Sequence, residues 1–453
     1  MTILLLGTAS CSQSEDGIDI VTPPTSKAVT LGVNVGVNTG AKTRAAMKGT
    51  KIKYEEAAYA TTDHAIGLVV TNADATGYYV AETENFEIGY SYTAPTVDIC
   101  FAGDKDGLNW KAIDMSGTFP TSASGEKEKT FYLDKNLGQV FAYFPFDKSK
   151  KTKATIAGGK ITYPITILDT SKDKLVAADN SKQKFSGAAW AANDATNSTH
   201  ILAGETDYLY FVPEDGKGRK VNNGVLPAAD GTVTPPDGTN TDENPGNDIS
   251  LSMKHALSMV TFRLYDKDLV KTAPTAANSA TTLGSVKSFK IENVAASGGP
   301  LKTGATTMNL NVTGDTDPID YAATASGSIS RTLDKYLLIR ARQTGTVGET
   351  ASASTFLYPE GGDGRDAANY ISTLVYPIAA MSENTVKVTF DILEPGSTKS
   401  FPLTTTLTVP DDGGWLANKN YIYTFSVSKK GLNVVDVTVA DWEDVEVGGV
   451  VEL

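Results

Sequence analysis

The chain has few of the residues that most metal sites and covalent frameworks use. It contains two cysteines and three histidines among 453 residues. Cys11 and Cys100 are too few for a disulfide framework or a zinc cluster, and Cys100, in a strand-like run, is expected to be a small buried apolar residue. The three histidines, His64, His200 and His255, are scattered along the sequence. We therefore expect no metal and no cofactor.

Long apolar runs and excess positive charge are also missing. No segment of 18 or more apolar residues occurs, which argues against a membrane-spanning helix. The net charge is −13, with 40 basic and 53 acidic residues, and phosphate binding needs a basic surface, so nucleic acid is not an expected partner. The one basic run, Lys148 to Lys153, is interpreted as a solvated loop.

Catalytic motifs are absent as well. The sequence has no zinc-protease HExxH, no phosphate loop, no GxSxG and no GxGxxG beside a strand–helix pair. A glycosidase needs only two carboxylates, but nothing singles out a pair among the 53 acidic residues. The four acidic residues Asp237, Asp242, Glu243 and Asp248 do not have the spacing of an EF-hand. We expect a protein that is not an enzyme, with a β-sandwich hydrolase as a remote alternative.

What the chain does have is short alternating segments bounded by Gly, Pro, Asn and Asp. Examples are 139–144, 158–167, 385–393 and 421–428. This pattern predicts an all-β fold of sandwich type, with one short helical turn expected at 105–115 around Trp110. The length favours two domains. A segment rich in Pro, Gly and Asp at 226–248 is either the linker between them or a long exposed loop just before it, and the predicted domains are an N-terminal one over 28–248 and a C-terminal one over 249–453.

The first ten residues are apolar and then small, and they end at Cys11. This resembles the end of a bacterial lipoprotein signal peptide, in which the cysteine is acylated, and residues 11–27 then form a polar tether. An ordinary secretory signal followed by an incidental cysteine is the alternative.

At both ends of the chain, apolar residues alternate with polar or small ones, as in a β-strand with one apolar face. Such a strand must lie on a core. A first strand that can be removed and a last strand that can replace it in a neighbour would build a polymer by strand donation. Arg44 is the first arginine in the chain and Arg219 is the next. An Arg-specific protease therefore has one candidate cleavage site before the middle of the chain. The residues of the two faces are Val29, Leu31, Val33, Val35 and Val37 at the start, and Val445, Val447, Val451 and Leu453 at the end.

Three motifs, in order, resemble those of the Bacteroidetes fimbrillins, the subunits of type V pili. They are Gln-Val-Phe-Ala-Tyr-Phe-Pro at 139–145, the segment around Lys254-His255-Ala256 at 252–264, and residues 415–431 followed by Ala-Asp-Trp-Glu at 440–443.

The resemblance implies two transthyretin-like β-sandwich domains in tandem and export as an outer-membrane lipoprotein that carries lipid, such as palmitate, on Cys11. It further implies cleavage after Arg44 by an Arg-specific or trypsin-like protease, so that residues 28–44 are removable. A donor strand near 434–453 of another fimbrillin subunit then fills the groove, and the product is an adhesive cell-surface fimbria. The alternative is a monomeric surface lipoprotein that binds glycans or host protein.

Overall fold

A computed structural model gives the fold of the chain between residues 29 and 441. The described residues are 29–37, 65–80, 99–103, 110–113, 131–133, 136–146, 153–168, 170–172, 176–177, 197–198, 200–203, 205–211, 218–222, 226–227, 233–234, 247–271, 282–313, 317–343, 370–393, 398–428 and 431–441. They form strands and, as the one helical element among them, a 3-10 turn, η5 (Tyr321–Ala323). No helix in these residues is long and apolar enough to cross a membrane. The all-β fold predicted from the sequence is confirmed.

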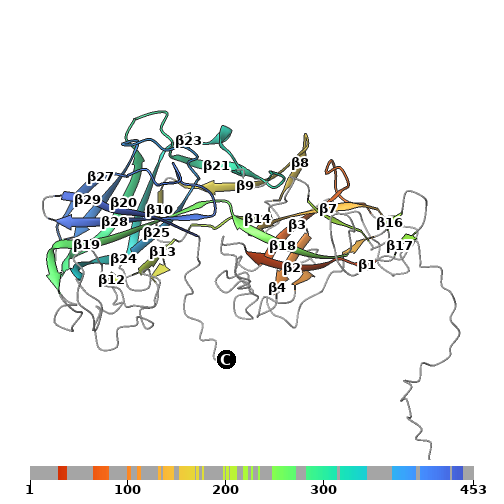
Figure 1. Cartoon of the computed structure of the whole chain (residues 1–453), viewed down its shortest axis with the longest axis horizontal. Helices are drawn as coiled ribbons and strands as arrows, with labels where there is room; N and C mark the ends of the chain where they lie inside the picture. Colours follow the sequence, from red (N-terminus) through yellow and green to blue (C-terminus); the bar gives the residue numbers. More distant parts are fainter. Residues whose placement is uncertain are drawn as a thin grey trace, which may run out of the picture.

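The molecule has two lobes side by side along its long axis (Figure 1). The C-terminal lobe contains a 12-stranded sheet. Its main path is β11 (Val176–Ala177), β13 (His200–Leu202), β25 (Tyr370–Val375), β19 (Ser258–Lys271), β24 (Ser328–Gln343), β20 (Thr282–Asn293), β26 (Val386–Leu393) and β27 (Ser400–Thr406). Off this path, β10 (Thr170–Lys172) and β12 (Asn197–Ser198) pair with β24, β28 (Lys419–Ser428) pairs with β19, and β29 (Gly431–Asp441) pairs with β28.

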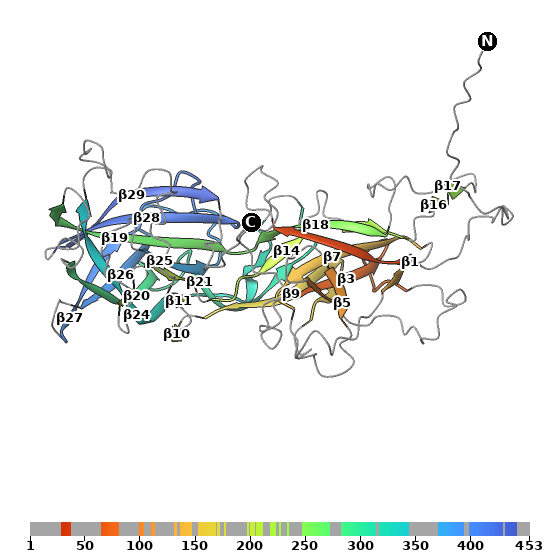
Figure 2. The same ribbon diagram turned by 90° about the horizontal axis from the view of Figure 1, so that it is seen from below.

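The N-terminal lobe contains an 8-stranded sheet. Its order is β2 (Gly32–Val37), β18 (Asp248–His255), β14 (Leu209–Phe211), β7 (Gly138–Phe144), β3 (Ala65–Asn72), β4 (Ile99–Gly103) and β5 (Trp110–Ile113), with β15 (Arg219–Val221) also paired to β7. Strand β2 is therefore an edge strand, and it lies along β18 in both side views (Figures 1 and 2).

A third sheet joins strands from the two halves of the chain. It contains five strands: β22 (Ile319–Asp320), β21 (Lys302–Asn309), β9 (Lys160–Ile167), β8 (Thr155–Ala157) and β23 (Ala325–Ser326). Two small pairs complete the description, β1 (Val29–Thr30) with β6 (Tyr132–Leu133) and β16 (Leu226–Pro227) with β17 (Val233–Thr234).

Apolar residues at alternate positions give many of the strands one face that packs on a core. In β26, Val386, Val388, Phe390 and Ile392 are fully buried and alternate with half-buried residues, as expected for a strand with one face on a core. Strand β7 is buried on both faces because it lies between two cores. Val140 and Ala142 join one cluster, and Phe141 and Tyr143 join the other, which continues into the C-terminal lobe.

Two side-chain contacts involve the stretch of chain between β13 and β14, which passes from one lobe to the other. His255, at the end of β18, is buried, and its Nδ1 lies 2.8 Å from Asp207 Oδ2. Arg331 in β24 is also buried, and its Nε donates to Glu205 Oε1 at 2.5 Å. The other oxygen of Glu205 accepts a hydrogen bond from the backbone N–H of Leu374. Asp207 and Glu205, which both lie between β13 and β14, are thereby held against β18 and against β24 and β25, respectively.

Two details differ from the sequence-based expectations. The helical turn expected around Trp110 is wrong, since residues 110–113 form strand β5, which pairs with β4. The strand that follows the predicted boundary at residue 248 is β18, and it pairs with β14 and β2 of the N-terminal lobe. Residues 170–202 contribute short strands to the C-terminal sheet, so the two halves of the sequence interleave. The residue limits of the two domains remain a prediction.

Candidate functional site

The candidate site is the edge of the N-terminal sheet that β1 and β2 cover. Strand β2 runs parallel to β18, with Gly32 opposite Asp248 and Val37 opposite Met253 at the two ends of the ladder. Strand β1 instead runs antiparallel to β6, with Val29 opposite Leu133. The first described segment of the chain thus lies on two strands that belong to different sheets.

The change of partner takes place at one residue. The backbone N–H of Leu31 donates to the carbonyl of Phe131 at 2.8 Å, and the N–H of the next residue, Gly32, donates to the carbonyl of Asn247 at 2.8 Å. Successive N–H groups of an extended chain point to opposite sides, so this segment satisfies backbone acceptors on both of its flanks. We call residues 29–37 the covering segment.

Apolar side chains hold the covering segment down. Leu31, Val33 and Val35 are 3%, 9% and 3% exposed and belong to the N-terminal lobe's own core cluster. Strand β18 contributes Ile249, Leu251 and Met253 to the same cluster, whereas Ser250 and Ser252 between them are exposed. This cluster is separate from the larger one that extends into the C-terminal lobe. Removing the covering segment would therefore open one edge and one core without touching the other core.

The other end of the described chain is built differently. Strand β29 runs antiparallel to β28, from Gly431 opposite Ser428 to Asp441 opposite Lys419. Leu432 is buried, and Val434, Val437 and Val439 pack on the large core cluster. The pairing register shifts between Thr424, which lies opposite Asp436, and Phe425, which lies opposite Val434. Because of this shift, Val434 packs on the same core as Val437 although their spacing is odd. Residues 434–441 of the predicted donor strand therefore pair within their own lobe.

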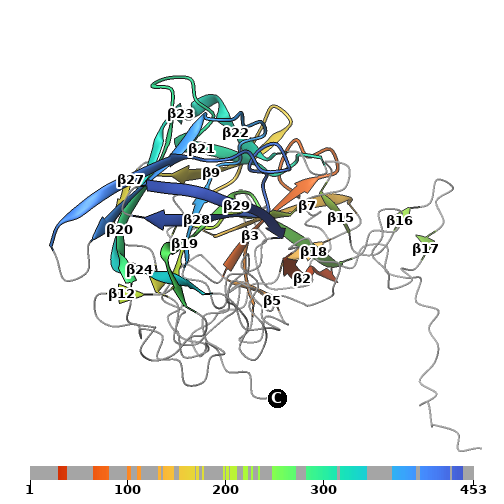
Figure 3. The same ribbon diagram turned by 60° about the vertical axis from the view of Figure 1, so that its left-hand side comes forward.

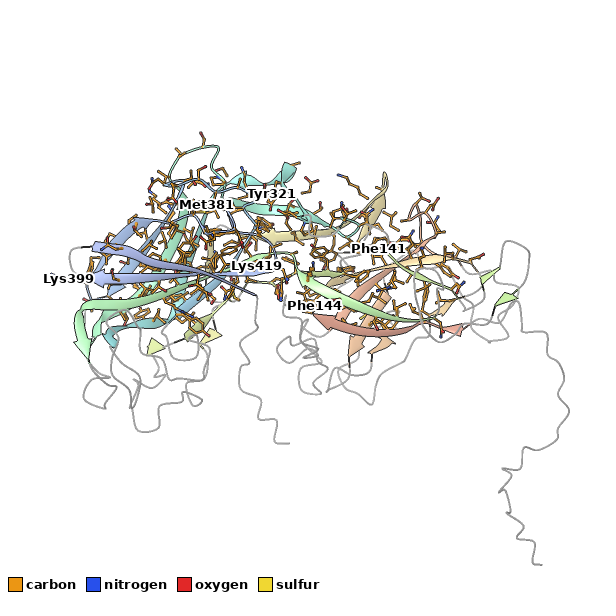
Figure 4. The ribbon with its side chains drawn as sticks, viewed as in Figure 1. Phe141, Phe144, Tyr321, Met381, Lys399 and Lys419 are labelled. Carbon is orange, nitrogen blue, oxygen red and sulfur yellow. The ribbon has the colours of Figure 1, made fainter. Side chains whose placement is uncertain are left out.

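The end of β29 lies at the junction between the lobes. Lys419, its register partner at that end, lies near the middle of the molecule (Figure 4). The neighbouring residue Asn418 accepts a hydrogen bond from the N–H of His255 through Oδ1, at 3.2 Å, and its own N–H donates to the carbonyl of Leu257 at 3.0 Å. The turned view shows the end of β29 directed toward β18 and β2 (Figure 3). Residue 442 thus follows a strand that ends close to the inner end of β18.

The sequence-predicted site residues fall into two groups. The structure brings Val29, Leu31, Val33, Val35 and Val37 together in the covering segment. Cys11, Arg44, Val445, Val447, Val451 and Leu453 lie outside the described residues. Sequence reasoning missed β18 as the partner of the first strand, although the alternation of Ile249, Leu251 and Met253 with two serines was a readable signal.

Residues with catalytic or ligand chemistry do not gather at this edge. In the described part of the chain, no group of three or more His, Cys, Asp or Glu residues is placed to hold a metal ion. Cys100 is buried in β4, as expected. His255 lies at the end of β18, where its side chain contacts Asp207. The arrangement is suited to backbone pairing and apolar burial.

Similar folds are found among solved structures of bacterial surface proteins. A proposed cell adhesion protein from Bacteroides uniformis is 16% identical, with 92% of this chain and 99% of that chain covered and a TM-score of 0.41. A second one, from Bacteroides ovatus, is 11% identical over 92% and 97% of the two chains, also with a TM-score of 0.41. The fimbrial anchor protein Mfa2 from Porphyromonas gingivalis is 12% identical over 92% and 99%, with a TM-score of 0.27.

No protein-family model and no curated protein sequence matches the chain. The structures named above are two proposed cell adhesion proteins of Bacteroides and a fimbrial anchor protein of Porphyromonas gingivalis.

Proposed function

We propose that the chain is a structural subunit of a type V pilus that polymerises by strand exchange after proteolysis. The observation that carries the proposal is the covering segment. It is an edge segment near the start of the chain, its apolar face is buried, and a single cut between it and β3 breaks its covalent connection to the strands that follow. Arg44 lies in that connection.

Cleavage after Arg44 makes an acceptor. The subunit that begins at Ala45 keeps β18 but has lost the strand beside it, so backbone groups along β18 and β6 and the apolar residues beneath them are uncovered. Each Leu or Val side chain that an incoming strand buries fully contributes about 1.5–3 kcal/mol, and each backbone hydrogen bond that it remakes contributes about 0.5–1.5 kcal/mol. An open edge of this kind gains stability by pairing with another strand.

The donor in this proposal is residues 445–453 of another copy. Their odd-numbered positions repeat the apolar alternation of the covering segment. They follow β29, which is held by a ladder to β28 over its length. The donor can therefore leave its own subunit without unfolding it. The product is a homopolymer, or a mixed fibre with related fimbrillin subunits.

Export and anchoring complete the proposal. Before cleavage, lipid on Cys11 would hold the precursor at the outer membrane through the tether of residues 11–27. Cleavage after Arg44 frees the subunit from that lipid and allows it to enter a fimbria at the cell surface, where its role is adhesion. Mass spectrometry of membrane-extracted protein tests the first step. The proposal requires lipid on Cys11, and a mature terminus elsewhere contradicts it.

The decisive experiment is cleavage of the purified full-length chain with an Arg-specific protease. N-terminal sequencing of the stable product should begin at Ala45, because exposed connections are cut before folded strands. Electron microscopy and size-exclusion chromatography of the same sample should then show polymers. The Arg44→Ala variant should stay monomeric, whereas Lys48→Ala, a change in the same connection, should polymerise as the parent does.

The outcome also separates the alternative function. If the cleaved parent stays monomeric and shows a saturable signal for a glycan or a host protein, the chain is a monomeric surface lipoprotein. If Arg44→Ala polymerises as well as the parent, polymerisation does not depend on cleavage at this site and the proposal is wrong.

A further inference from the structure

Strand β9 contacts both lobes along its length. Near its middle, Tyr163 stacks on Tyr143 of β7, with the ring centroids 4.0 Å apart, and its hydroxyl donates to the carbonyl of Pro145 at 2.8 Å. Just beyond its last residue, the carbonyl of Leu168 accepts a hydrogen bond from Nη2 of Arg331 in β24, at 3.2 Å. The strand thus runs from the N-terminal sheet to the C-terminal sheet, and it lies between the two lobes in both side views (Figures 1 and 2).

The stacked pair of tyrosines depends on a glycine in the neighbouring strand. A Cβ atom on Gly67 of β3 would overlap the ring of Tyr143. The ring therefore lies directly against the backbone of β3, where it is fully buried and stacks on Tyr163. A larger side chain at position 67 would displace the ring and weaken the contact between the N-terminal sheet and β9.

Two tyrosine hydroxyls hold the last two residues of β9, one on each flank. The N–H of Thr166 donates to Tyr208 Oη at 3.2 Å, and the N–H of Ile167 donates to Tyr376 Oη at 3.1 Å; successive N–H groups of a strand point to opposite sides. Tyr376 Oη in turn donates to the carbonyl of Gly304 at 2.8 Å. Because Gly304 is the register partner of Ile167, the Tyr376 hydroxyl bridges β9 and β21 at the end of their ladder.

Tyr376 belongs to the C-terminal lobe, since it directly follows β25. It is fully buried, and its ring meets that of Tyr321 at 90°, with the centroids 6.3 Å apart. Burial raises the pKa of the Tyr376 hydroxyl above its ordinary value, so the hydroxyl keeps the proton that it donates to Gly304. One side chain of the C-terminal lobe thus accepts a hydrogen bond from β9 and donates one to β21.

The chain and its larger core also pass between the lobes. Among the described residues the chain crosses three times: through β9, between β13 and β14, and between β18 and β19. The larger core cluster contains Phe141 of the N-terminal sheet together with Phe262 and Phe390 of the C-terminal sheet. Two domains on one linker move relative to each other unless their interface is large and apolar, and here a shared core and several crossings oppose such motion.

We infer that β9 joins the two lobes into one rigid body and that the Tyr376 hydroxyl keeps β9 and β21 together at the end held by the C-terminal lobe. A pull or a bend applied to one lobe then reaches the other through the β9–β21 ladder, which extends from Thr162 opposite Asn309 to Ile167 opposite Gly304. The inference goes beyond the proposed function and holds whether or not the chain polymerises.

Distances between spin labels test the rigid body. Ala73 in the N-terminal lobe and Ala380 in the C-terminal lobe are exposed. In the full-length chain with Cys11→Ser, the variant Ala73→Cys/Ala380→Cys takes labels at these two positions, because Cys100 is buried. Pulsed electron paramagnetic resonance should give one narrow distance distribution, as narrow as that of Ala380→Cys/Lys399→Cys, whose labels both lie in the C-terminal lobe. A broad or two-peaked distribution between the lobes, beside a narrow one within the lobe, overturns the inference.

Hydrogen exchange tests the role of Tyr376. Tyr376→Phe removes the acceptor of the Ile167 N–H, so amide exchange at the end of β9 should become about tenfold faster. The matched control is Tyr423→Phe. Tyr423 is equally buried, and its hydroxyl accepts from Trp415 Nε1 at 2.9 Å and donates to the carbonyl of Thr408 at 3.0 Å, within the C-terminal lobe. This control should leave exchange in β9 unchanged.

Unchanged exchange in β9 of Tyr376→Phe overturns the role of its hydroxyl. Equal acceleration by Tyr376→Phe and Tyr423→Phe overturns it as well, because exchange in β9 would then follow the overall stability of the fold. The distance measurement needs no variant at the junction, so the rigid body is tested even if Tyr376→Phe does not fold.

Discussion

Strands β2 and β29 are both edge strands near the ends of the described chain, but they are attached in different ways. Strand β29 follows β28 directly, with Ser428 opposite Gly431, and an antiparallel ladder then runs to Asp441. Strand β2 is parallel to a strand from the middle of the chain, with Gly32 opposite Asp248. A local hairpin is held by the chain itself, whereas a parallel pair depends on a long connection. A cut between β2 and β3 would therefore break the covalent connection between β2 and its partner strand, whereas β29 stays connected to β28.

The largest effect should come from a charge on the donor face. Val447→Asp places a carboxylate on the apolar face of the proposed donor, which would enter the core that Leu31 occupies in the uncleaved chain, and an unpaired buried charge costs several kcal/mol. Polymerisation after cleavage should be lost, with no change in the thermal unfolding of the monomer. Glu446→Lys, on the opposite face of the same segment, should polymerise normally. Size-exclusion chromatography and circular dichroism measure both properties, and unfolding of the Val447→Asp monomer would instead assign the segment to its own subunit's core.

Two truncations should separate β29 from the segment that follows it. A chain that ends at Trp442 keeps the β28–β29 ladder and should unfold at the same denaturant concentration as the parent, but it should not polymerise. A chain that ends at Ser428 loses β29 and uncovers the core beneath Leu432, which should cost several kcal/mol of unfolding free energy. Equal stability of the two truncated chains would show that β29 is as detachable as β2.

Matched leucine substitutions in the two edge strands give a smaller difference. Leu31 and Leu432 are 3% and 6% exposed, and each change to alanine costs about 2–5 kcal/mol if the strand stays bound. For Leu31→Ala in the uncleaved chain the loss should be lower, because the covering segment can detach before the rest unfolds. The variant should also polymerise faster after cleavage, since the old strand leaves sooner. Urea unfolding and light scattering measure the two effects, and equal losses would mean that both strands belong to one cooperative unit.

The smallest expected effect comes from a site in neither strand. Burial raises the pKa of the Asp317 carboxyl, which accepts hydrogen bonds from Tyr321 Oη at 2.5 Å and from the N–H of Ile319 at 2.9 Å. A carboxyl whose folded pKa lies above its unfolded value stabilises the fold at low pH, and that contribution is lost as the pH rises through the folded pKa. Asp317→Asn should therefore gain stability relative to the parent between pH 4 and pH 7, by on the order of 1 kcal/mol.

Urea unfolding of the parent and of Asp317→Asn at the two pH values measures this difference. Cleavage after Arg44 and polymerisation should be the same in both proteins, because Asp317 lies in the C-terminal lobe beside β22. A difference in stability that does not change with pH would mean that Asp317 titrates alike in the folded and unfolded chains.

Strands with one buried face, such as 385–393, could be predicted from the sequence. Burial of alternate residues requires apolar side chains at every second position, and this repeat is visible in the sequence. The same rule identified the apolar face of the covering segment. Pairing partners could not be read, because β18 and β2 are distant in sequence and nothing local specifies their meeting. The error at Trp110 has a related cause. The four residues of β5 form an edge strand beside β4, and such a short element carries little periodicity of its own.

The distance in sequence between β2 and β18 also bears on how the precursor folds. Contacts between distant segments form late, because the entropy of closing a long loop opposes them until other structure exists. Strands β3, β7, β14 and β18 build most of their sheet from the chain between residues 65 and 255, so we expect the groove to form before the first-made strand fills it. We expect entry of a strand into a preformed groove to be the last folding step of the precursor, within one chain, and the proposed assembly of the fibre would repeat that step between two chains.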